Sequence, residues 1–172
     1  MAKKDDKNTK KNVKTVKIKA TVKYKGFTYK ITSIGANAFK NNKKLTKVTF
    51  GKNVKTIGNR AFYGCKKLKT VKYTNKGKAI VKIGDYAFGN CKALKSFTIP
   101  VNVKTIGKFA FDKCSNLGTV TINSTKLKTV GTKAFKSVKK GAKFKCPAKK
   151  KKKYEQKLRK SGLPKKGKVV KK

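Results

Sequence analysis

The sequence predicts an α/β solenoid, a right-handed superhelix of about five repeats of 23–26 residues. The first observation is a motif that recurs in phase: IGANAFKNNKKLTKVTF begins at Ile34, IGNRAFYGCKKLKTVKY at Ile57, IGDYAFGNCKALKSFTI at Ile83, IGKFAFDKCSNLGTVTI at Ile106 and VGTKAFKSVKKGAKFKC at Val130. The second is a period-2 alternation that ends each copy, and the third is a glycine near its start. A unit this short cannot bury its apolar side alone, so the copies are expected to stack around one continuous core.

Each repeat is predicted to contain a glycine turn, a short helical or 3₁₀ turn, and a strand. Counted from the first Ile or Val as position zero, the apolar positions are 4, 5, 8, 11, 14 and 16. In the third copy, Leu94-x-x-Phe97-x-Ile99 ends in the alternation of a half-buried strand. Position 2 holds the helix N-cap types Asn59, Asp85 and Thr132. Val54 and Val103 indicate a second short extended stretch before the next Ile.

The repeated positions also predict side-chain ladders inside the coil. One ladder consists of the phenylalanines Phe39, Phe62, Phe88, Phe111 and Phe135. A second consists of the leucines Leu45, Leu68, Leu94 and Leu117, and a third of the cysteines Cys65, Cys91 and Cys114. Neighbouring members are expected about 4.8 Å apart, the spacing of adjacent strands.

The ends of the chain are expected to cap this core. Residues 1–12 are predicted to be a disordered basic tail, and residues 13–33 a β cap with a hairpin turn at Lys25-Gly26. The repeats occupy 34–146, and residues 147–172 form a lysine-rich helical cap that Pro147 opens and Ser161-Gly162 ends. Tyr154 and Leu158 give this helix a narrow apolar stripe, and KGKVVKK is expected to add a strand.

The motif resembles the BspA-like leucine-rich repeats of bacterial surface proteins. Their pattern, Ile-Gly-x-x-Ala-Phe-x-x-Cys-x-x-Leu-x-x-Val-x-Ile-Pro, fits residues 83–100 almost position for position and recurs over 34–146. The chain departs from the pattern at Asn42 and Val138, which stand at the Cys position, and in its lysine content. The resemblance implies a leucine-rich-repeat superhelix with short parallel strands on a concave face. It further implies an extracellular location at a bacterial cell surface and adhesion to host or bacterial surface proteins.

Charge is the unusual feature of the composition. Lysine and arginine total 51 against five acidic residues, which leaves a net charge of +46, and Arg60 and Arg159 are the only arginines. Lysine is a flexible, strongly hydrated point charge, whereas the arginine fork reads phosphates and bases. The composition therefore predicts salt-sensitive attraction to anionic polymers, nucleic acid among them, without sequence preference.

Catalytic and metal chemistry have few residues to use. The chain has no histidine, and its acids are Asp5, Asp6, Asp85, Asp112 and Glu155, which fall in different repeat phases or in the terminal segments. The four cysteines, Cys146 included, raise the alternatives of two disulfides or a zinc site, but no Cys-x-x-Cys pair occurs. We therefore expect buried reduced thiols, no enzyme activity, no metal and no cofactor.

Two basic surfaces are candidate binding sites. The first is the outward side of the strands on the expected concave face: Thr46, Lys47, Thr49, Lys69, Thr70, Lys72, Lys95, Ser96, Thr98, Gly118, Thr119, Thr121, Ala142, Lys143 and Lys145. Lys47, Thr49, Lys69, Lys72, Lys95, Thr98, Lys143 and Lys145 are its candidate contact residues. The second is the densest cluster of lysines: Lys149, Lys150, Lys151, Lys152 and Lys153. Each surface is also consistent with a solvated face that binds no partner.

The sequence thus favours a non-catalytic interaction module, and the family resemblance adds adhesion as its role. The alternative is a polyanion-binding module for teichoic acid, acidic glycan or nucleic acid that acts through charge alone. No apolar run reaches the roughly 18 residues of a membrane-spanning helix, and the first residues do not form a secretory signal. A cytoplasmic monomer is therefore the alternative to a monomeric domain at the cell surface.

Overall fold

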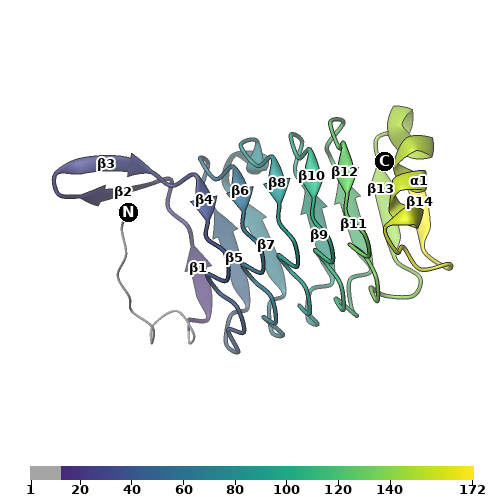
Figure 1. Cartoon of the computed structure of the whole chain (residues 1–172), viewed down its shortest axis with the longest axis horizontal. Helices are drawn as coiled ribbons and strands as arrows, with labels where there is room; N and C mark the ends of the chain where they lie inside the picture. The colour runs from purple at the N-terminus through teal and green to yellow at the C-terminus, as the bar shows by residue number, and fades with distance from the viewer. Residues whose placement is uncertain (1–12) are drawn as a thin grey trace.

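The computed structural model describes residues 13–172 as an elongated stack of coils, so the predicted tail 1–12 lies outside the described residues (Figure 1). Each coil contributes one strand to a long-strand row and one to a short-strand row. The long row consists of β1 (Thr15–Lys17), β5 (Lys47–Phe50), β7 (Thr70–Tyr73), β9 (Ser96–Ile99), β11 (Thr119–Ile122), β13 (Lys143–Cys146) and β14 (Lys168–Lys171). The short row consists of β4 (Ser33–Ile34), β6 (Thr56–Ile57), β8 (Lys82–Ile83), β10 (Thr105–Ile106) and β12 (Thr129–Val130).

All pairings within the two rows are parallel, as a solenoid requires. The short row is continuous, whereas the long row divides into the sheets β1-β5-β7 and β9-β11-β13-β14. The division coincides with the longest repeat spacing, where the short helix η1 (Thr74–Gly77) is inserted after β7. The Tyr73 hydroxyl donates to the Thr98 carbonyl at 2.9 Å and links the two sheets. The predicted solenoid is therefore confirmed, while its right-handed sense stays a prediction.

The segment after each glycine is a chain of turns, in which the amides of Ala38 and Lys40 donate to carbonyls three residues earlier. The predicted turn therefore forms, but it does not continue into a helix. Positions 3 and 7 of every repeat have a positive φ, as at Asn37 (59°), Asn41 (57°) and Tyr86 (54°). This conformation interrupts a helix and turns alternate amides along the solenoid axis. The amide of Phe39 donates to the Ala61 carbonyl of the next coil at 2.7 Å, and that of Phe62 to Ala87 at 2.8 Å. Every second amide therefore bonds to the next coil, and the amides between them bond within their own turn.

The position-2 side chains serve this stacking and do not cap helices. Asn59 Oδ1 accepts from the Asp85 amide at 2.9 Å, and Asp85 Oδ1 accepts from the Lys108 amide at 2.7 Å. The same arrangement explains the glycine at position 1, because a Cβ on Gly84 would lie 2.5 Å from Asn59 Oδ1. Glycine is thus needed for the close approach of two coils, even though its φ is ordinary.

The core lies between the two rows and is closed at the C-terminal end. The five ladder phenylalanines stack with centroid separations of 5.2, 5.3, 5.5 and 5.2 Å and nearly parallel rings. The leucine and cysteine ladders are fully buried beside them. After η2 (Ala148–Lys150), helix α1 (Lys151–Lys160) covers the last coil with Tyr154 and Leu158, both buried. The helix ends as predicted, because Gly162 has a φ of 87° and the Leu163 amide donates to Leu158.

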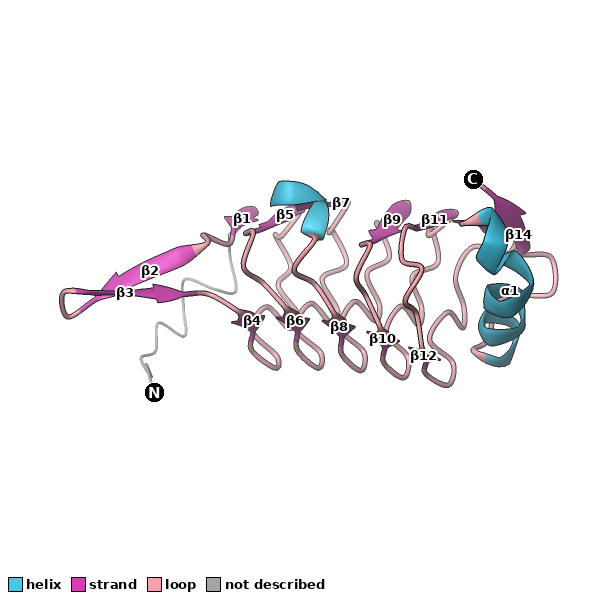
Figure 2. Cartoon of the chain, turned by 90° about the horizontal axis from the view of Figure 1, so that it is seen from above, coloured by secondary structure: helices cyan, strands magenta, loops and turns pink. Residues whose placement is uncertain are grey.

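The N-terminal end has a different construction. β1 adds a strand to the long row, but the antiparallel hairpin of β2 (Thr21–Tyr24) and β3 (Phe27–Lys30) projects away from the stack (Figure 2). Its turn is at Lys25-Gly26 as predicted, and both residues have a positive φ. The hairpin leaves Val22, Tyr24, Phe27 and Tyr29 exposed, so it does not bury them over the first coil.

Candidate binding surface

The long-strand face is the outward side of β5, β7, β9, β11 and β13. Lysine alternates with threonine on β5 and β7, whereas β9 and β11 present only serine or threonine and β13 presents only lysine. The register places Lys47 beside Thr15 and Thr70, and Thr49 beside Lys17 and Lys72. Strand spacing and rise then put the Lys47 and Lys72 backbones roughly 8 Å apart on a diagonal. The lysines of β5 and β7 are thereby dispersed, which lowers their mutual repulsion.

Most of the predicted contact residues do point to solvent on this face. Lys47, Lys69, Lys72, Lys95, Thr98, Lys143 and Lys145 are exposed, and Thr49 is half-buried. Ala142 is a correction, because it is fully buried and not outward-facing. It precedes β13 and its amide closes a turn onto the Lys139 carbonyl at 2.9 Å, so its side chain points into the core. Whether the face is concave stays a prediction.

A shallow hollow lies where β9, β11 and β13 begin. Its volume is about 590 Å³, and Gly118 and Gly141, which have no side chains, provide the room. Lys95, Lys139 and Lys143 surround it, together with Asn116 and Thr119. Three ammonium groups around an open depression favour an anionic group such as a carboxylate, sulfate or phosphate.

Almost none of this positive charge is neutralised within the described part of the chain. In residues 13–172 the one ion pair joins Arg159 to Glu155 at 3.4 Å. Asp85 is engaged by the Lys108 amide and lies in the turns, away from the long-strand face. The field of the lysines therefore extends into solvent, where salt screens it over roughly 8 Å.

The C-terminal lysine cluster lies on η2 and the first turn of α1. Lys149, Lys152 and Lys153 are exposed, while Lys150 and Lys151 are half-buried. Cationic side chains at a helix N-terminus oppose the helix dipole, so this position is not one that helix stability favours. The helix is retained because Tyr154 anchors it, with its hydroxyl donating to the Ser124 carbonyl at 3.0 Å.

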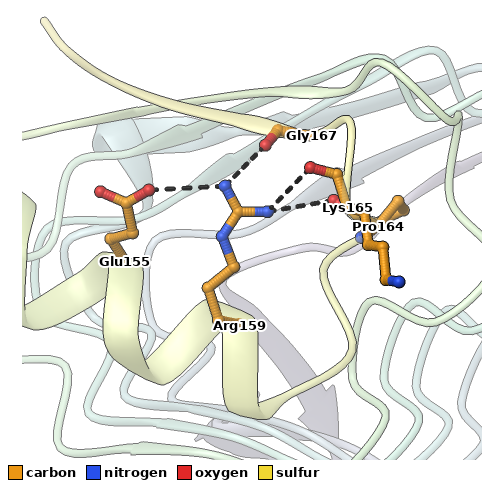
Figure 3. A network of polar contacts seen from close by, with 5 residues as sticks. All are labelled: Glu155, Arg159, Pro164, Lys165 and Gly167. Atoms are coloured by element: carbon orange, nitrogen blue, oxygen red, sulfur yellow. Dashed lines mark hydrogen bonds and ion pairs between the residues drawn. The ribbon is translucent and has the colours of Figure 1, made fainter.

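Arg159 has a structural role, which the sequence did not reveal. Its guanidinium donates to the carbonyls of Pro164 at 3.1 Å, Lys165 at 3.4 Å and Gly167 at 2.9 Å, besides Glu155 (Figure 3). These bonds hold the turn between α1 and β14. The arginine fork is thus used to fasten the C-terminal cap.

The four cysteines lie inside the coil. Cys65, Cys91 and Cys114 each donate a thiol hydrogen bond to the phenylalanine carbonyl of the preceding coil, at 3.0, 3.2 and 3.1 Å. Burial raises the pKa of Cys65 to about 11 and that of Cys114 to about 12. These thiols are therefore poor nucleophiles at neutral pH. That all four are reduced stays a prediction.

The described acids do not form a catalytic or metal-binding group. Asp85, Asp112 and Glu155 lie in different coils, and within residues 13–172 no three His, Cys, Asp or Glu side chains converge as metal ligands would. Asp112 Oδ1 is buried and accepts no hydrogen bond from residues 13–172.

Aromatic and arginine side chains gather at position 3 of the turns, a surface that the strand-based prediction missed. The guanidinium of Arg60 lies 5.2 Å from the Tyr86 ring centre, Tyr86 stacks on Phe109 at 4.7 Å, and Lys133 lies 5.8 Å from Phe109. The rings and cations contact one another along the solenoid axis. These contacts hold neighbouring coils together and leave the ring faces occupied. Its sequence signal was the bulky residue that stands two places after the glycine in the last four repeats.

Comparison with known proteins agrees with this construction. The sequence matches the family described as "BspA type Leucine rich repeat region (6 copies)" over residues 32–161. A leucine-rich repeat protein from Bacteroides capillosus is 33% identical with a TM-score of 0.56, and the match covers 64% of this chain and 77% of that one. No curated protein sequence matches the chain.

Two further solved structures show the same fold over more of this chain. A leucine-rich repeat protein from Bacteroides ovatus is 26% identical with a TM-score of 0.68, and the match covers 93% of this chain but 42% of that one. The T. pallidum leucine-rich repeat protein is 24% identical with a TM-score of 0.67, with 78% and 59% covered. The chain therefore spans about half the length of these two relatives.

Leucine-rich repeat folds of this type are generally binding modules without catalytic activity, and proteins that carry them typically occur at the cell surface. No helix in residues 13–172 is long and apolar enough to cross a membrane. The recurring motif, the parallel coils and the match over 32–161 together show that the chain belongs to the BspA-type leucine-rich repeat family.

Proposed function

We propose that this chain is a non-catalytic adhesion module of a bacterial surface protein and that it binds its partners through the long-strand face. One observation carries the proposal: a regular face of parallel strands presents lysine and threonine, and no described acid neutralises it. Family membership supports an interaction role at the cell surface. A partner that fits this face carries acidic groups over a broad surface, such as a host or bacterial surface protein.

The hollow between Lys95, Lys139 and Lys143 gives this face a place for one acidic group of the partner. Threonines between the lysines add hydroxyl donors and acceptors, so contact on this face combines hydrogen bonding with charge. Such contact is less sensitive to salt than charge alone, because hydrogen bonds and excluded water persist when the Debye length shrinks.

The second candidate function is charge-only binding of teichoic acid, acidic glycan or nucleic acid. The exposed lysines Lys149, Lys152 and Lys153 favour it, because they are the densest charges and gain nothing for the helix that bears them. This binding has no sequence preference, and its affinity falls linearly with salt on a double-logarithmic scale.

Two sets of variants, matched in number and exposure, distinguish the candidates. Set one carries Lys47→Gln, Lys72→Gln and Lys95→Gln, and set two carries Lys149→Gln, Lys152→Gln and Lys153→Gln; all six lysines are exposed. Binding is measured at several salt concentrations to lipoteichoic acid, heparin, duplex DNA and an immobilised extracellular-matrix protein. Adhesion predicts that set one weakens matrix-protein binding more, with a shallow salt dependence. Charge-only binding predicts that set two weakens polyanion binding more, with a steep one.

Binding that neither set changes at physiological salt contradicts both candidate functions. The chain would then be a spacer whose charge keeps it soluble. A monomeric state throughout is expected, since a net charge of +46 opposes self-association.

A further inference from the structure

The β2–β3 hairpin is a surface that the repeat does not explain. The family match begins at residue 32, after the hairpin has ended. Both views show β2 and β3 extending beyond the first coil, with neither strand covered by another element (Figures 1 and 2). Its base is held by Asn53, whose Nδ2 donates to the Ala20 carbonyl at 3.0 Å.

The hairpin has one apolar face and one basic face. Val22 pairs with Tyr29 and Tyr24 with Phe27, so these four side chains share a face. Their exposed fractions are 50%, 50%, 54% and 68%, and they are four of the five exposed large hydrophobic residues in the described part of the chain. Thr21 pairs with Lys30 and Lys23 with Thr28 on the opposite face. A two-stranded hairpin with a bare apolar face is marginally stable alone, so a partner that covers it stabilises it.

Within residues 13–172, both edges of the hairpin are also open. The Ile31 amide donates to Ala20 at 2.9 Å, and hydrogen-bonded pairs alternate with non-bonded ones along an antiparallel ladder. Val22–Tyr29 and Tyr24–Phe27 are therefore the bonded pairs. The amides and carbonyls of Thr21 and Lys23 on β2, and of Thr28 and Lys30 on β3, point outward. β3 is exposed at every residue, whereas β2 begins at the half-buried Thr21.

We propose that the outer edge of β3 accepts an extended segment of a partner protein as a third, antiparallel or parallel strand, and that this segment alternates apolar and acidic residues. Apolar side chains of such a strand continue the face of Tyr29 and Phe27, and its carboxylates lie beside Lys30 and Lys23 on the other face. Main-chain bonds to Thr28 and Lys30 provide affinity, and the two faces provide specificity.

Charge selects this partner over the other possible occupants of the apolar face. A second copy of the chain brings a like net charge of +46. A lipid surface leaves the outward amides and carbonyls of both edges unpaired in an apolar medium, which is strongly unfavourable. An acidic strand satisfies one edge, covers the apolar face and neutralises the lysines together. This site does not use the long-strand lysines, so it stands or falls separately from the proposed function.

The test uses the full chain and a blocked peptide of alternating valine and glutamate, with binding followed by tyrosine fluorescence or calorimetry. There are two control peptides. One alternates valine and lysine, and the other has the same valine–glutamate composition but groups all the valines before all the glutamates. Vesicles that contain phosphatidylserine test the lipid surface. The expected result is binding of the valine–glutamate alternation alone. Equal binding of either control peptide, no peptide binding, or binding of vesicles instead overturns the proposal.

A matched pair of variants locates the edge. Thr28→Pro removes an outward amide from β3, and Thr21→Pro removes one from β2, while neither removes a bond within the hairpin. Thr28→Pro is expected to lower the affinity for the valine–glutamate peptide at least about tenfold, since it deletes one main-chain bond and obstructs the added strand. Thr21→Pro is expected to leave binding within about twofold of the unmodified chain. Equal losses, or none, overturn strand addition at β3.

A charge-reversal variant keeps the proposal testable if Thr28→Pro disorders the hairpin. Lys23→Glu combined with Lys30→Glu leaves every backbone amide in place. It is expected to bind the valine–lysine peptide and to lose the valine–glutamate one. A variant whose preference does not change overturns the acidic partner.

Discussion

The two ends of the solenoid differ in how they cover the apolar side of the terminal coil. At the C-terminal end, Tyr154 and Leu158 are buried over the last coil and Arg159 fastens the following turn. At the N-terminal end, Phe39 is only partly buried and the hairpin carries its largest side chains into solvent. A terminal coil must satisfy its amides and cover its apolar side. The C-terminal end does both internally. Within residues 13–172, the N-terminal end leaves accepting carbonyls and part of its apolar side uncovered.

The turn ladder shows the difference at single atoms. In the last coil the Phe135 amide donates to the Ser161 carbonyl at 3.2 Å, so the residue that ends α1 replaces a further coil. In the first coil the carbonyls of Ala36, Ala38 and Lys40 occupy the accepting positions of the ladder. Within residues 13–172, no coil precedes them to donate. The C-terminal end is therefore closed by its own helix, whereas the described N-terminal end keeps acceptors that another segment could satisfy.

The two terminal phenylalanines of the ladder test this contrast most strongly. Phe39 and Phe135 each stack on one inner ring at 5.2 Å, but Phe135 is fully buried and also meets Phe144 at 4.9 Å. Phe135→Ala should cost about 3–5 kcal/mol, like the interior change Phe88→Ala, because each leaves a cavity. Phe39→Ala should cost about half as much, since part of its surface is already in water. Urea unfolding measures all three, and equal costs for Phe39 and Phe135 contradict an open N-terminal end.

The glycines at position 1 give a second matched pair. A Cβ on Gly131 would lie 2.6 Å from the Gly107 carbonyl carbon, whereas a Cβ on Gly35 meets nothing within 4 Å. Gly131→Ala should therefore cost about 1–3 kcal/mol through overpacking. Gly35→Ala should be neutral or stabilise by about 0.4–1 kcal/mol, because it restricts the unfolded chain. Thermal unfolding compares the two, and a destabilised Gly35→Ala indicates that another segment covers the first coil.

The pH dependence of the free energy of unfolding tests how completely the cysteine thiols are shielded from water. Burial raises the pKa of Cys114 from 9.0 to about 12, so its stabilising contribution is complete below pH 9 and is lost as the pH rises toward 12. At Cys146 burial also raises the pKa, but Lys151 and Lys172 oppose the shift. Between pH 9 and 11, Cys114→Ala should reduce the alkaline loss of unfolding free energy by about 1 kcal/mol per pH unit. Cys146→Ala should reduce it less, and the reverse order contradicts a sealed core at the cysteine ladder.

Side-chain hydrogen bonds also hold the C-terminal end more firmly than the N-terminal hairpin. Arg159 bonds three carbonyls around the α1–β14 turn, whereas Asn53 holds the hairpin base through one bond to Ala20. Arg159→Lys keeps the charge but loses the fork, and it should cost about 1–2 kcal/mol. Asn53→Ala should cost about 0.5–1.5 kcal/mol, and proteolysis should then cut near the hairpin first. A larger cost for Asn53 would mean that the hairpin is part of the folded core.

Repetition explains which parts of this structure the sequence could predict. Phe88 and Leu94 recur at fixed positions in neighbouring copies, and stacking leaves such residues one place, inside the coil. The strand faces followed from the same alternation, except at Ala142, where the turn before β13 decides the direction of the side chain. The helix boundary at Ser161-Gly162 followed from local chemistry, which does not depend on distant contacts.

The missed features depend on contacts that occur once or on backbone shape. The turns at positions 3 and 7 had a signal in Asn37, Asn41 and Asn90, since Asn tolerates a positive φ, but Tyr86 and Phe109 obscured it. The fastening by Arg159 joins residues whose approach only the folded turn creates. The hairpin alternation showed which residues share a face, yet the direction in which the hairpin projects depends on its junction with β1 and β4.

The smallest expected change in stability is also the sharpest test of the N-terminal surface. Phe27 is 68% exposed at the end of the hairpin, so Phe27→Ser should alter the free energy of unfolding by less than about 0.5 kcal/mol. Tyr154→Ser at the opposite end should cost several times more, because that side chain is 1% exposed and its hydroxyl bonds Ser124. Phe27→Ser should nevertheless lower the affinity for the valine–glutamate peptide, since the ring forms part of the apolar face that the added strand extends. A loss above about 1 kcal/mol for Phe27→Ser would mean that the ring is already packed in the free protein, and the hairpin would then be a cap that offers no docking surface.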